Sequence, residues 1–298
     1  MRLSELAGSG HFIRIIEVFP PAMPSPESLE PVQKFDLSLR FDRLIQGLIR
    51  TEALADAFSL PELKDGNRVH LNSIGVATEI KRRTGSEVIP TITLRDANRH
   101  NLLGMLTYAL FAGIENLLIV RGDPYGDNSY RDPKNVYDVS KVSSLISTTR
   151  KLESHIASEH ALCVLSPINL RKSSDEAYLK TVKERELSGV DLFIGEQMFE
   201  DLETYLARIE AIRKYGIHKP IVHSIFPLKD DEDAASLVQK FGWGINDFEL
   251  ANLKKGGARY GLETARERYR ALLSHKDLIQ GVSISTRGNP EVARYIFR

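Results

Sequence analysis

Three polar positions lie in or directly after apolar runs of the sequence, and their side chains are candidates for chemistry. The first is Glu17, a carboxylate between the apolar residues Ile16 and Val18. A titratable group in such surroundings is a candidate for a functional site, because burial perturbs its pKa. The alternative is an inward carboxylate tied to a neighbouring cation, and the position of Glu17 alone does not separate the two.

The second position is a charged pair separated by glycine. The apolar run 116–120 ends abruptly in Arg121, Gly122 and Asp123. Glycine lets a backbone approach a ligand closely, and the end of a barrel strand would turn Asp123 toward the mouth. An Arg–Asp pair that closes an ordinary loop is the alternative, and it stays open at this point.

The third position is Gln197, which follows the run 191–194. Its side-chain amide donates and accepts hydrogen bonds at once, so it suits the amide edge of a pterin-like ring. The alternative is that Gln197 caps the next helix.

Short apolar runs alternate with longer segments of helical periodicity, which is typical of parallel strands joined by crossover helices. The predicted strands are 12–18, 57–60, 88–94, 116–120, 161–166, 191–194, 220–225 and 280–285. The predicted helices are 29–49, 73–84, 98–112, 139–155, 175–187, 201–214, 231–241 and 260–274. Asn98 is a suitable N-cap and Gly113 a suitable helix stop. About eight such units favour a single (β/α)8 TIM-type barrel over an open doubly wound sheet.

The region 242–259 breaks the alternation, with glycines at its start and near its end. We expect an extra helical excursion there, before the last strand, and one catalytic domain over residues 1–298. No glycine-rich dinucleotide fingerprint follows a strand, so the sequence does not support a Rossmann site.

Composition narrows the classes of partner. The 298 residues carry 40 basic and 40 acidic side chains, so no net field favours nucleic acid or an anionic membrane. No stretch approaches the roughly 18 apolar residues that span a bilayer, and we expect a cytoplasmic protein that binds a small molecule. Cys163, in an apolar run, is expected in the core. No histidine spacing predicts a metal site, and we expect a structural role for His223.

Taken together, these motifs resemble those of the methylenetetrahydrofolate reductase family. The resemblance rests on Glu17-Val18-Phe19-Pro20-Pro21, Arg121-Gly122-Asp123-Pro124, and Gln197-Met198-Phe199-Glu200-Asp201 with Tyr205. Their order and approximate spacing match the family. The third strand, which contains Thr91 and Thr93, also falls where the family has one.

The resemblance implies an oxidoreductase of one-carbon metabolism and methionine biosynthesis. It would reduce 5,10-methylenetetrahydrofolate to 5-methyltetrahydrofolate by hydride transfer through FAD, as a flavoprotein with NADH or NADPH as the electron donor. Glu17 would be the general acid that opens the substrate's imidazolidine ring, helped by a pKa raised among Ile16, Val18 and Phe19. Asp123 would lie close to pterin and flavin and tune both electrostatically.

The resemblance also implies a set of binding residues. Gln197, Phe199 and Tyr205 would contact the folate. Arg121, Gly122 and Asp123 would line the flavin. Thr91, Thr93, Tyr137 and Arg185 are further cofactor-binding candidates, Arg185 as a phosphate partner.

The chain departs from the family on the flavin side. After the fifth strand, where the family presents a tyrosine and a histidine, this chain has Ser166-Pro167-Ile168-Asn169-Leu170-Arg171, and Thr91 replaces a histidine of many members. Two alternatives therefore stay open: a folate-dependent enzyme that couples to methyl transfer or demethylation without FAD, and a non-catalytic folate-binding barrel. A homo-oligomer and an electron-donor or methyltransferase partner protein are left open as well.

Overall fold

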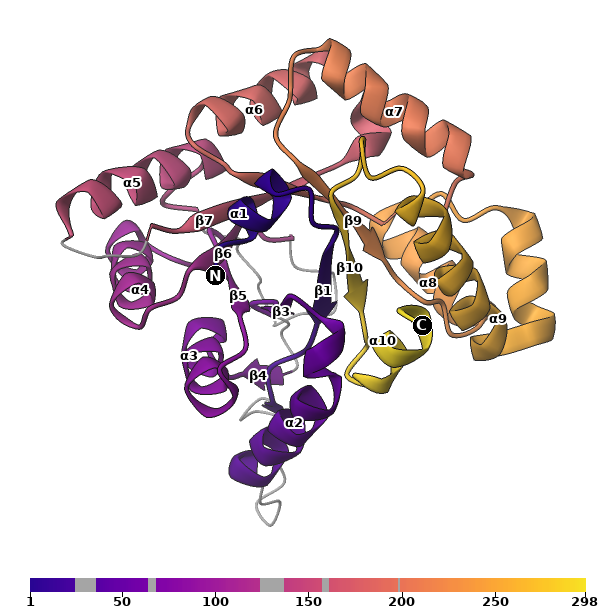
Figure 1. The fold of residues 1–298 in the computed structure, drawn as a ribbon, viewed down its shortest axis with the longest axis horizontal. Coiled ribbons are helices and arrows are strands. Elements are labelled where there is room, and N and C mark those ends of the chain that lie inside the picture. Colours follow the sequence, from indigo (N-terminus) through magenta and orange to yellow (C-terminus); the bar gives the residue numbers. More distant parts are fainter. Residues whose placement is uncertain (25–35, 64–67, 124–136, 157–160, 198) are drawn as a thin grey trace.

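The strands close into a barrel around one axis (Figure 1). The structure is a computed structural model and describes residues 1–24, 36–63, 68–123, 137–156, 161–197 and 199–298. Eight parallel strands pair in the order β1-β10-β9-β8-β7-β6-β5-β3. Their bounds are β1 Ile13–Glu17, β3 Ala57–Leu60, β5 Val88–Thr93, β6 Asn116–Val120, β7 Cys163–Ile168, β8 Leu192–Gly195, β9 Ile221–Ile225 and β10 Gly281–Ser285. The closed barrel confirms the predicted fold class.

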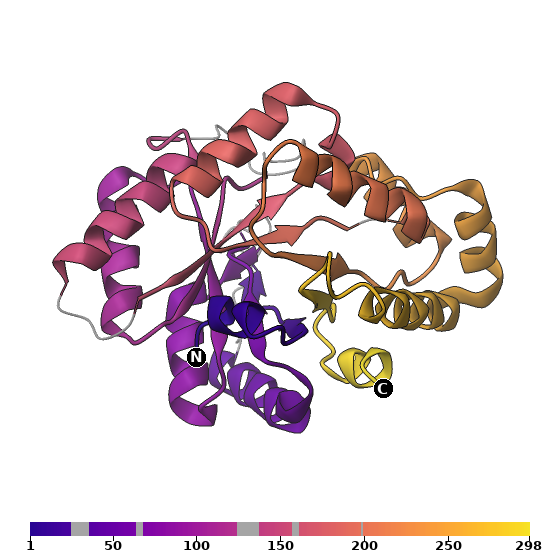
Figure 2. The same cartoon turned by 45° about the horizontal axis from the view of Figure 1, so that its top comes forward.

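Helices surround the strands (Figure 2). They are α2 Leu37–Thr51, α3 Ser73–Thr84, α4 Arg99–Phe111, α5 Val142–His155, α6 Glu176–Leu187, α7 Leu202–Lys214, α8 Asp231–Phe241 and α9 Asp247–Leu273. Short 3₁₀ turns cover Glu52–Leu54 and Leu170–Lys172, and the short strands β2 Ala22–Pro24 and β4 Arg68–His70 pair outside the barrel. The first part of the predicted helix 29–49 lies outside the described residues.

The expected excursion before the last strand is helical. α8 and α9 both lie between β9 and β10, and α9 kinks at Gly257, where φ is 53° and ψ is −147°. A glycine tolerates this left-handed φ without a Cβ penalty. The predicted helix 260–274 is therefore the last part of a longer element. α10 Glu291–Ile296 follows β10 and was not predicted.

Local signals explain several boundaries. Asn98 caps α4 by accepting a hydrogen bond from the Asn101 amide at 2.8 Å, and Gly113 ends the same segment with a φ of 69°. Both predicted boundaries are confirmed.

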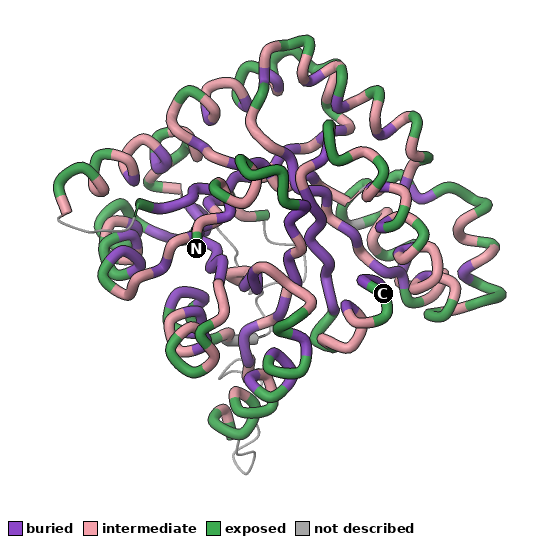
Figure 3. The backbone as a smooth tube through the Cα atoms, in the orientation of Figure 1, coloured by how far each residue is buried: buried purple, intermediate pink, exposed green. Residues whose placement is uncertain are grey.

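Two layers of apolar side chains stabilise the barrel, one inside it and one between the strands and the helices. Most of the backbone coloured as buried in Figure 3 belongs to the strands. Alternate strand residues, among them Ile13, Ile15 and Cys163, pack inside the barrel, so the predicted core position of Cys163 is confirmed. The intervening residues pack outward against the helices. α1 Leu3–Gly8, which was not predicted, closes the amino-terminal end of the barrel with the buried Leu3, whose amide donates to Asn116 Oδ1 at 2.8 Å.

Candidate active site

Glu17 is the last residue of β1 and lies at the carboxyl-terminal mouth of the barrel. Ile13 and Ile15 belong to the inner layer, so strand alternation turns Glu17 inward as well. Its register partner on β10 is Ser285, whose hydroxyl donates a hydrogen bond of 2.7 Å to Glu17 Oε1. Thr286 Oγ1 donates to the Glu17 carbonyl at 2.8 Å and fixes the backbone there.

The electrostatics of Glu17 suit a proton donor. Burial raises the pKa of the Glu17 carboxyl above its ordinary value near 4.5, and the hydrogen bond from Ser285 opposes that rise. In the described part of the chain, no arginine, lysine or histidine comes within 4 Å of this carboxylate. The alternative was that a neighbouring cation pairs with an inward Glu17, and these residues supply no such cation.

Several hydroxyl groups share the inner face of the barrel with Glu17. The alternation of side chains along β3, β5 and β10 places five buried hydroxyl side chains on the inner face of the barrel: Ser59, Thr91, Thr93, Ser283 and Ser285. The hydroxyls of Thr91 and Thr93 have no hydrogen-bond partner among the described residues. Buried hydroxyls are nearly always hydrogen-bonded in native proteins, so this pair on β5 has hydrogen-bonding capacity that the described residues do not use.

Gly122 is required for packing between strand ends. Its φ is +87°, and a Cβ there would lie 2.3 Å from Thr93 Cγ2 and 3.0 Å from Arg95 Cβ. We predicted from the sequence that Gly122 admits a ligand to the backbone. That stays a prediction; the structure shows that the side chains of Thr93, the last residue of β5, and of Arg95, which follows β5, occupy the space where a Cβ at position 122 would lie.

Arg95, which sequence reasoning missed, holds the segment that follows β6. Its guanidinium is buried, donates to the carbonyl of Asp123, and forms an ion pair of 3.0 Å with Asp96 Oδ2. Asp123 itself is exposed at the mouth. The sequence left open that an Arg–Asp pair closes this loop. In the structure an arginine does hold the loop, but it is Arg95, and it binds the backbone carbonyl of Asp123 and not the carboxylate.

Tyr137 lies at this end of the barrel. Its hydroxyl donates to the Gly122 carbonyl at 3.3 Å, and the Arg121 guanidinium carbon lies 5.0 Å from the centre of its ring. An isolated bridge pairs Ala97 with Tyr137. The structure thus brings Arg121, Gly122 and Tyr137 together beside β5.

Gln197 and Phe199 follow β8. Gln197 is half-buried, and the N-cap of α7 is Asp201, which accepts from the Thr204 amide at 2.8 Å. Gln197 is therefore not the cap. Phe199 is buried against the helical excursion, 5.5 Å from Trp243 between ring centres, so it anchors the segment that positions Gln197.

Two predicted site residues lie in the layer between the barrel and its helices. Tyr205 on α7 packs in the outer apolar layer. Arg185 on α6 is buried, and its guanidinium donates to Ser166 Oγ at 3.1 Å and to the Pro167 carbonyl. The structure does not bring either residue to Glu17, because the helix phase turns both toward the outer faces of the strands.

Comparison with known proteins agrees with the geometry. The family model for methylenetetrahydrofolate reductase matches residues 40–247, more than half of the chain. Methylenetetrahydrofolate reductase 1 of Schizosaccharomyces pombe is 29% identical over 119 residues, which is 39% of this chain and 19% of that protein. The chain thus matches only about a fifth of that relative's length.

Solved structures show the fold alone. A 2,3-dimethylmalate lyase has a TM-score of 0.53 at 10% identity, covering 98% of this chain and 82% of its own. The phosphoenolpyruvate phosphomutase of Streptomyces platensis subsp. rosaceus has a TM-score of 0.50 at 12% identity, covering 96% and 80%. Of the helices that the structure describes, none has the length and apolar character to cross a membrane.

Proposed function

Because the chain belongs to the methylenetetrahydrofolate reductase family, we propose that it reduces 5,10-methylenetetrahydrofolate to 5-methyltetrahydrofolate. The observation that carries the proposal is Glu17: an inward carboxyl at the barrel mouth, with a raised pKa and a serine as its hydrogen-bond donor. Family membership supports an oxidoreductase, and this site supports a step that needs an acid.

The proton transfer follows from the state of Glu17. The protonated carboxyl donates its proton to a ring nitrogen of the substrate as the bond between that nitrogen and the bridging carbon breaks. The product of that step is an iminium, and hydride addition to its carbon yields the methyl group. Glu17 is left ionised, is stabilised by the hydroxyl of Ser285, and regains a proton from solvent before the next turnover.

Folate recognition is assigned to the segment after β8. Gln197 is free of the capping role, and its amide both donates and accepts, as the pterin edge requires. Phe199 contributes by anchoring this segment against Trp243. Asp123, exposed at the same mouth, supplies a negative charge near the reacting groups.

FAD fits the residues beside β5. The unpartnered hydroxyls of Thr91 and Thr93 would hydrogen-bond to it, and Arg121, Gly122 and Tyr137 would hold it from the end of β6. When bound, it would supply a two-electron hydride carrier between NADH or NADPH and the folate. Arg185 is left out of this set, since its guanidinium already donates to β7.

The test is an absorbance spectrum of the purified protein with and without added FAD, followed by anaerobic addition of NADH and then of methylenetetrahydrofolate. We expect flavin absorbance that NADH bleaches and that the folate restores. Bleaching without reoxidation by the folate would reject the proposed substrate. A colourless protein that binds methyltetrahydrofolate would favour a folate-dependent methyl transfer or demethylation instead. Ser166 motivates this second candidate, because it stands on the flavin side of the family's site but its hydroxyl faces Arg185 and not the mouth.

A further inference from the structure

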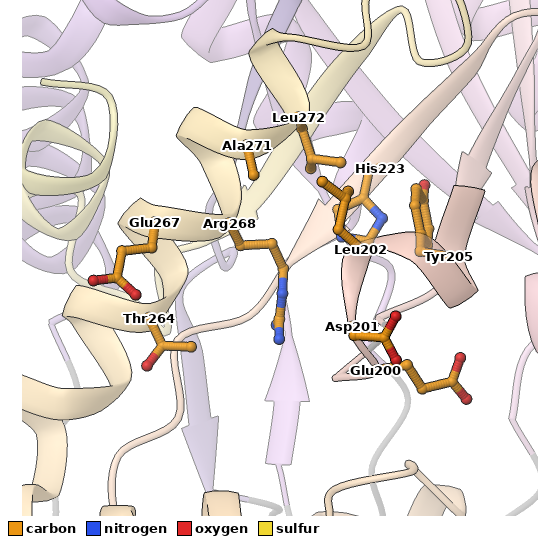
Figure 4. A pocket seen from close by; sticks show the side chains of 10 residues that line it. All are labelled: Glu200, Asp201, Leu202, Tyr205, His223, Thr264, Glu267, Arg268, Ala271 and Leu272. Carbon is orange, nitrogen blue, oxygen red and sulfur yellow. The ribbon is translucent and has the colours of Figure 1, made fainter. Parts of the chain in front are cut away.

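A cavity lies on the outside of the barrel, between α7 and α9, with β9 as its floor (Figure 4). Its volume is about 260 Å³, below the range of roughly 300–1,000 Å³ that is usual for drug-sized ligands. Residues of α9 line one side and residues of α7 the other. It is distinct from the mouth, because Val222 packs inside the barrel and the neighbouring His223 therefore points outward.

His223 forms the floor of this cavity and has unmet hydrogen-bonding capacity. The side chain is 1% exposed, and neither ring nitrogen has a partner among the described residues. Burial, together with the charge of Arg268, lowers the pKa of His223 to about 3, so the imidazole is neutral. A neutral imidazole presents one donor and one acceptor.

Tyr205 adds a second unpartnered polar group to the same cavity. It is 3% exposed, its hydroxyl has no partner in the described part of the chain, and its ring meets the His223 ring edge-on at 4.5 Å between centres. Leaving such groups unsatisfied in a protein interior costs free energy. Two residues with such groups, His223 and Tyr205, line one cavity, and the imidazole at its floor lies on the side of Arg268, which indicates a space that takes a polar ligand.

Arg268 is the positively charged residue among the side chains that line the cavity. Burial lowers the pKa of this guanidinium, yet it remains a cation. It lies 5.3 Å from the centre of the Phe199 ring, donates no hydrogen bond to the described residues, and has no carboxylate among them within 4 Å. Glu249 influences it only from farther away.

The acids around the cavity are already neutralised or exposed. Glu200 pairs with Arg208 at 2.8 Å, and Asp201 accepts two hydrogen bonds from Thr204 as the cap of α7. Glu267 is exposed at the rim, where solvent screens its charge. Glu200 Oε2 is buried without a hydrogen-bond partner among the described residues, and the half-buried Glu249 acts on Arg268 from beyond ion-pair distance. Arg268 is therefore the cation of this cavity that no carboxylate of the described residues contacts within 4 Å.

We propose that this cavity binds a small organic carboxylate. Arg268 is its ionic partner, His223 donates to one of its oxygens, and the apolar side chains of Leu202, Ala271 and Leu272 cover its hydrocarbon part. The assignment is independent of the folate reaction and of the cofactor.

Titration calorimetry of the full chain with benzoate tests the proposal, with benzamide as the uncharged molecule of the same shape. We expect benzoate to bind and benzamide to bind at least roughly tenfold more weakly, because only the carboxylate forms charge-assisted hydrogen bonds. Arg268→Gln should weaken benzoate binding by a similar factor. Arg270→Gln, an exposed position on the same helix, should leave it unchanged.

Ala271→Leu provides a variant that keeps every charge and fills the cavity. We expect it to remove benzoate binding while the circular dichroism spectrum of the protein stays that of the wild type. The imidazole nitrogens of His223, identified in ¹⁵N spectra by their loss in His223→Phe, should shift when benzoate is added to the wild type. Benzoate binding that survives both Arg268→Gln and Ala271→Leu would place the probe elsewhere, and this result or an absence of binding would overturn the proposal.

Discussion

Ser285 and Glu17 are 268 residues apart in the sequence, yet the Ser285 hydroxyl donates a 2.7 Å hydrogen bond to the Glu17 carboxylate. The contact spans the seam at which the last strand, β10, closes against the first, β1. Barrel closure therefore assembles the group to which we assign acid catalysis, and it also supplies the hydrogen bond that limits the rise of its pKa.

Replacement of Glu17 tests the assigned acid. Glu17→Gln keeps the size and polarity of the side chain and removes the transferable proton. We expect folate reduction to fall by at least about 100-fold, in line with the loss of a general acid, while reduction of bound flavin by NADH changes less than about twofold. Separate measurement of the two half-reactions checks this, with the exposed Glu176→Gln as the control. Folate turnover equal to that of the wild type would refute the role.

Replacement of Ser285 should shift the pH profile of folate reduction. The hydroxyl stabilises the ionised form of Glu17, so Ser285→Ala raises the pKa of that carboxyl further. Because the reaction needs the protonated form, the decline in rate on the alkaline side should move to higher pH by roughly one unit. Ser283→Ala, two residues earlier on the same strand and not bonded to Glu17, is the matched control. An unchanged profile in Ser285→Ala would show that the hydrogen bond does not tune the acid.

The same carboxyl should make folding stability depend on pH. The pKa of Glu17 is higher in the folded protein than its ordinary value near 4.5, so the folded state binds this proton more tightly. Stability from this group is fully present below that value and is lost as pH rises through the folded-state pKa. Glu17→Gln should therefore have a higher free energy of unfolding than the wild type at about pH 8, and a difference that shrinks toward about pH 4. Urea denaturation at both pH values measures it, and a variant less stable at the higher pH would contradict the argument.

Much of the barrel could be predicted because its signals are local. The apolar runs 57–60 and 116–120 coincide with β3 and β6, and the cap and stop residues Asn98 and Gly113 bound α4 and the turn after it. α1 could not be predicted in this way. Its short apolar segment gains stability only when Leu3 enters a barrel end that the whole chain must first form.

The position of a candidate residue at the barrel mouth could be predicted where motif and strand end coincide, as they do for Glu17 at the end of β1 and Gly122 just after β6. Arg95 and Ser285 were missed because their roles come from pairing between strands distant in sequence. For Tyr205 the motif suggested a folate contact, but the phase of α7 turns the ring toward His223 in the outer layer. A helical wheel of α7 places Tyr205 on the same face as Ile209 and Ile212, both of which are buried, so this signal was available in the sequence.

Gly122 should be irreplaceable for a reason that a ligand does not explain. Alanine at position 122 would bear a strained φ of +87° and place its Cβ 2.3 Å from Thr93 Cγ2. We expect Gly122→Ala to lower the free energy of unfolding by about 2–4 kcal/mol, since backbone strain and overpacking add. Gly113→Ala is the matched control, because its φ of +69° is also left-handed but no atom lies within 4 Å of the added Cβ, so we expect only about 1 kcal/mol there.

A double variant separates the two contributions at position 122. Thr93→Ser removes the methyl group that the new Cβ would meet, so Gly122→Ala combined with Thr93→Ser should regain roughly 1 kcal/mol relative to the sum of the single changes. Urea denaturation of the four proteins in this cycle measures the coupling. Equal costs for Gly122→Ala and Gly113→Ala, with no coupling to Thr93, would show that the contact between the ends of β5 and β6 does not select glycine.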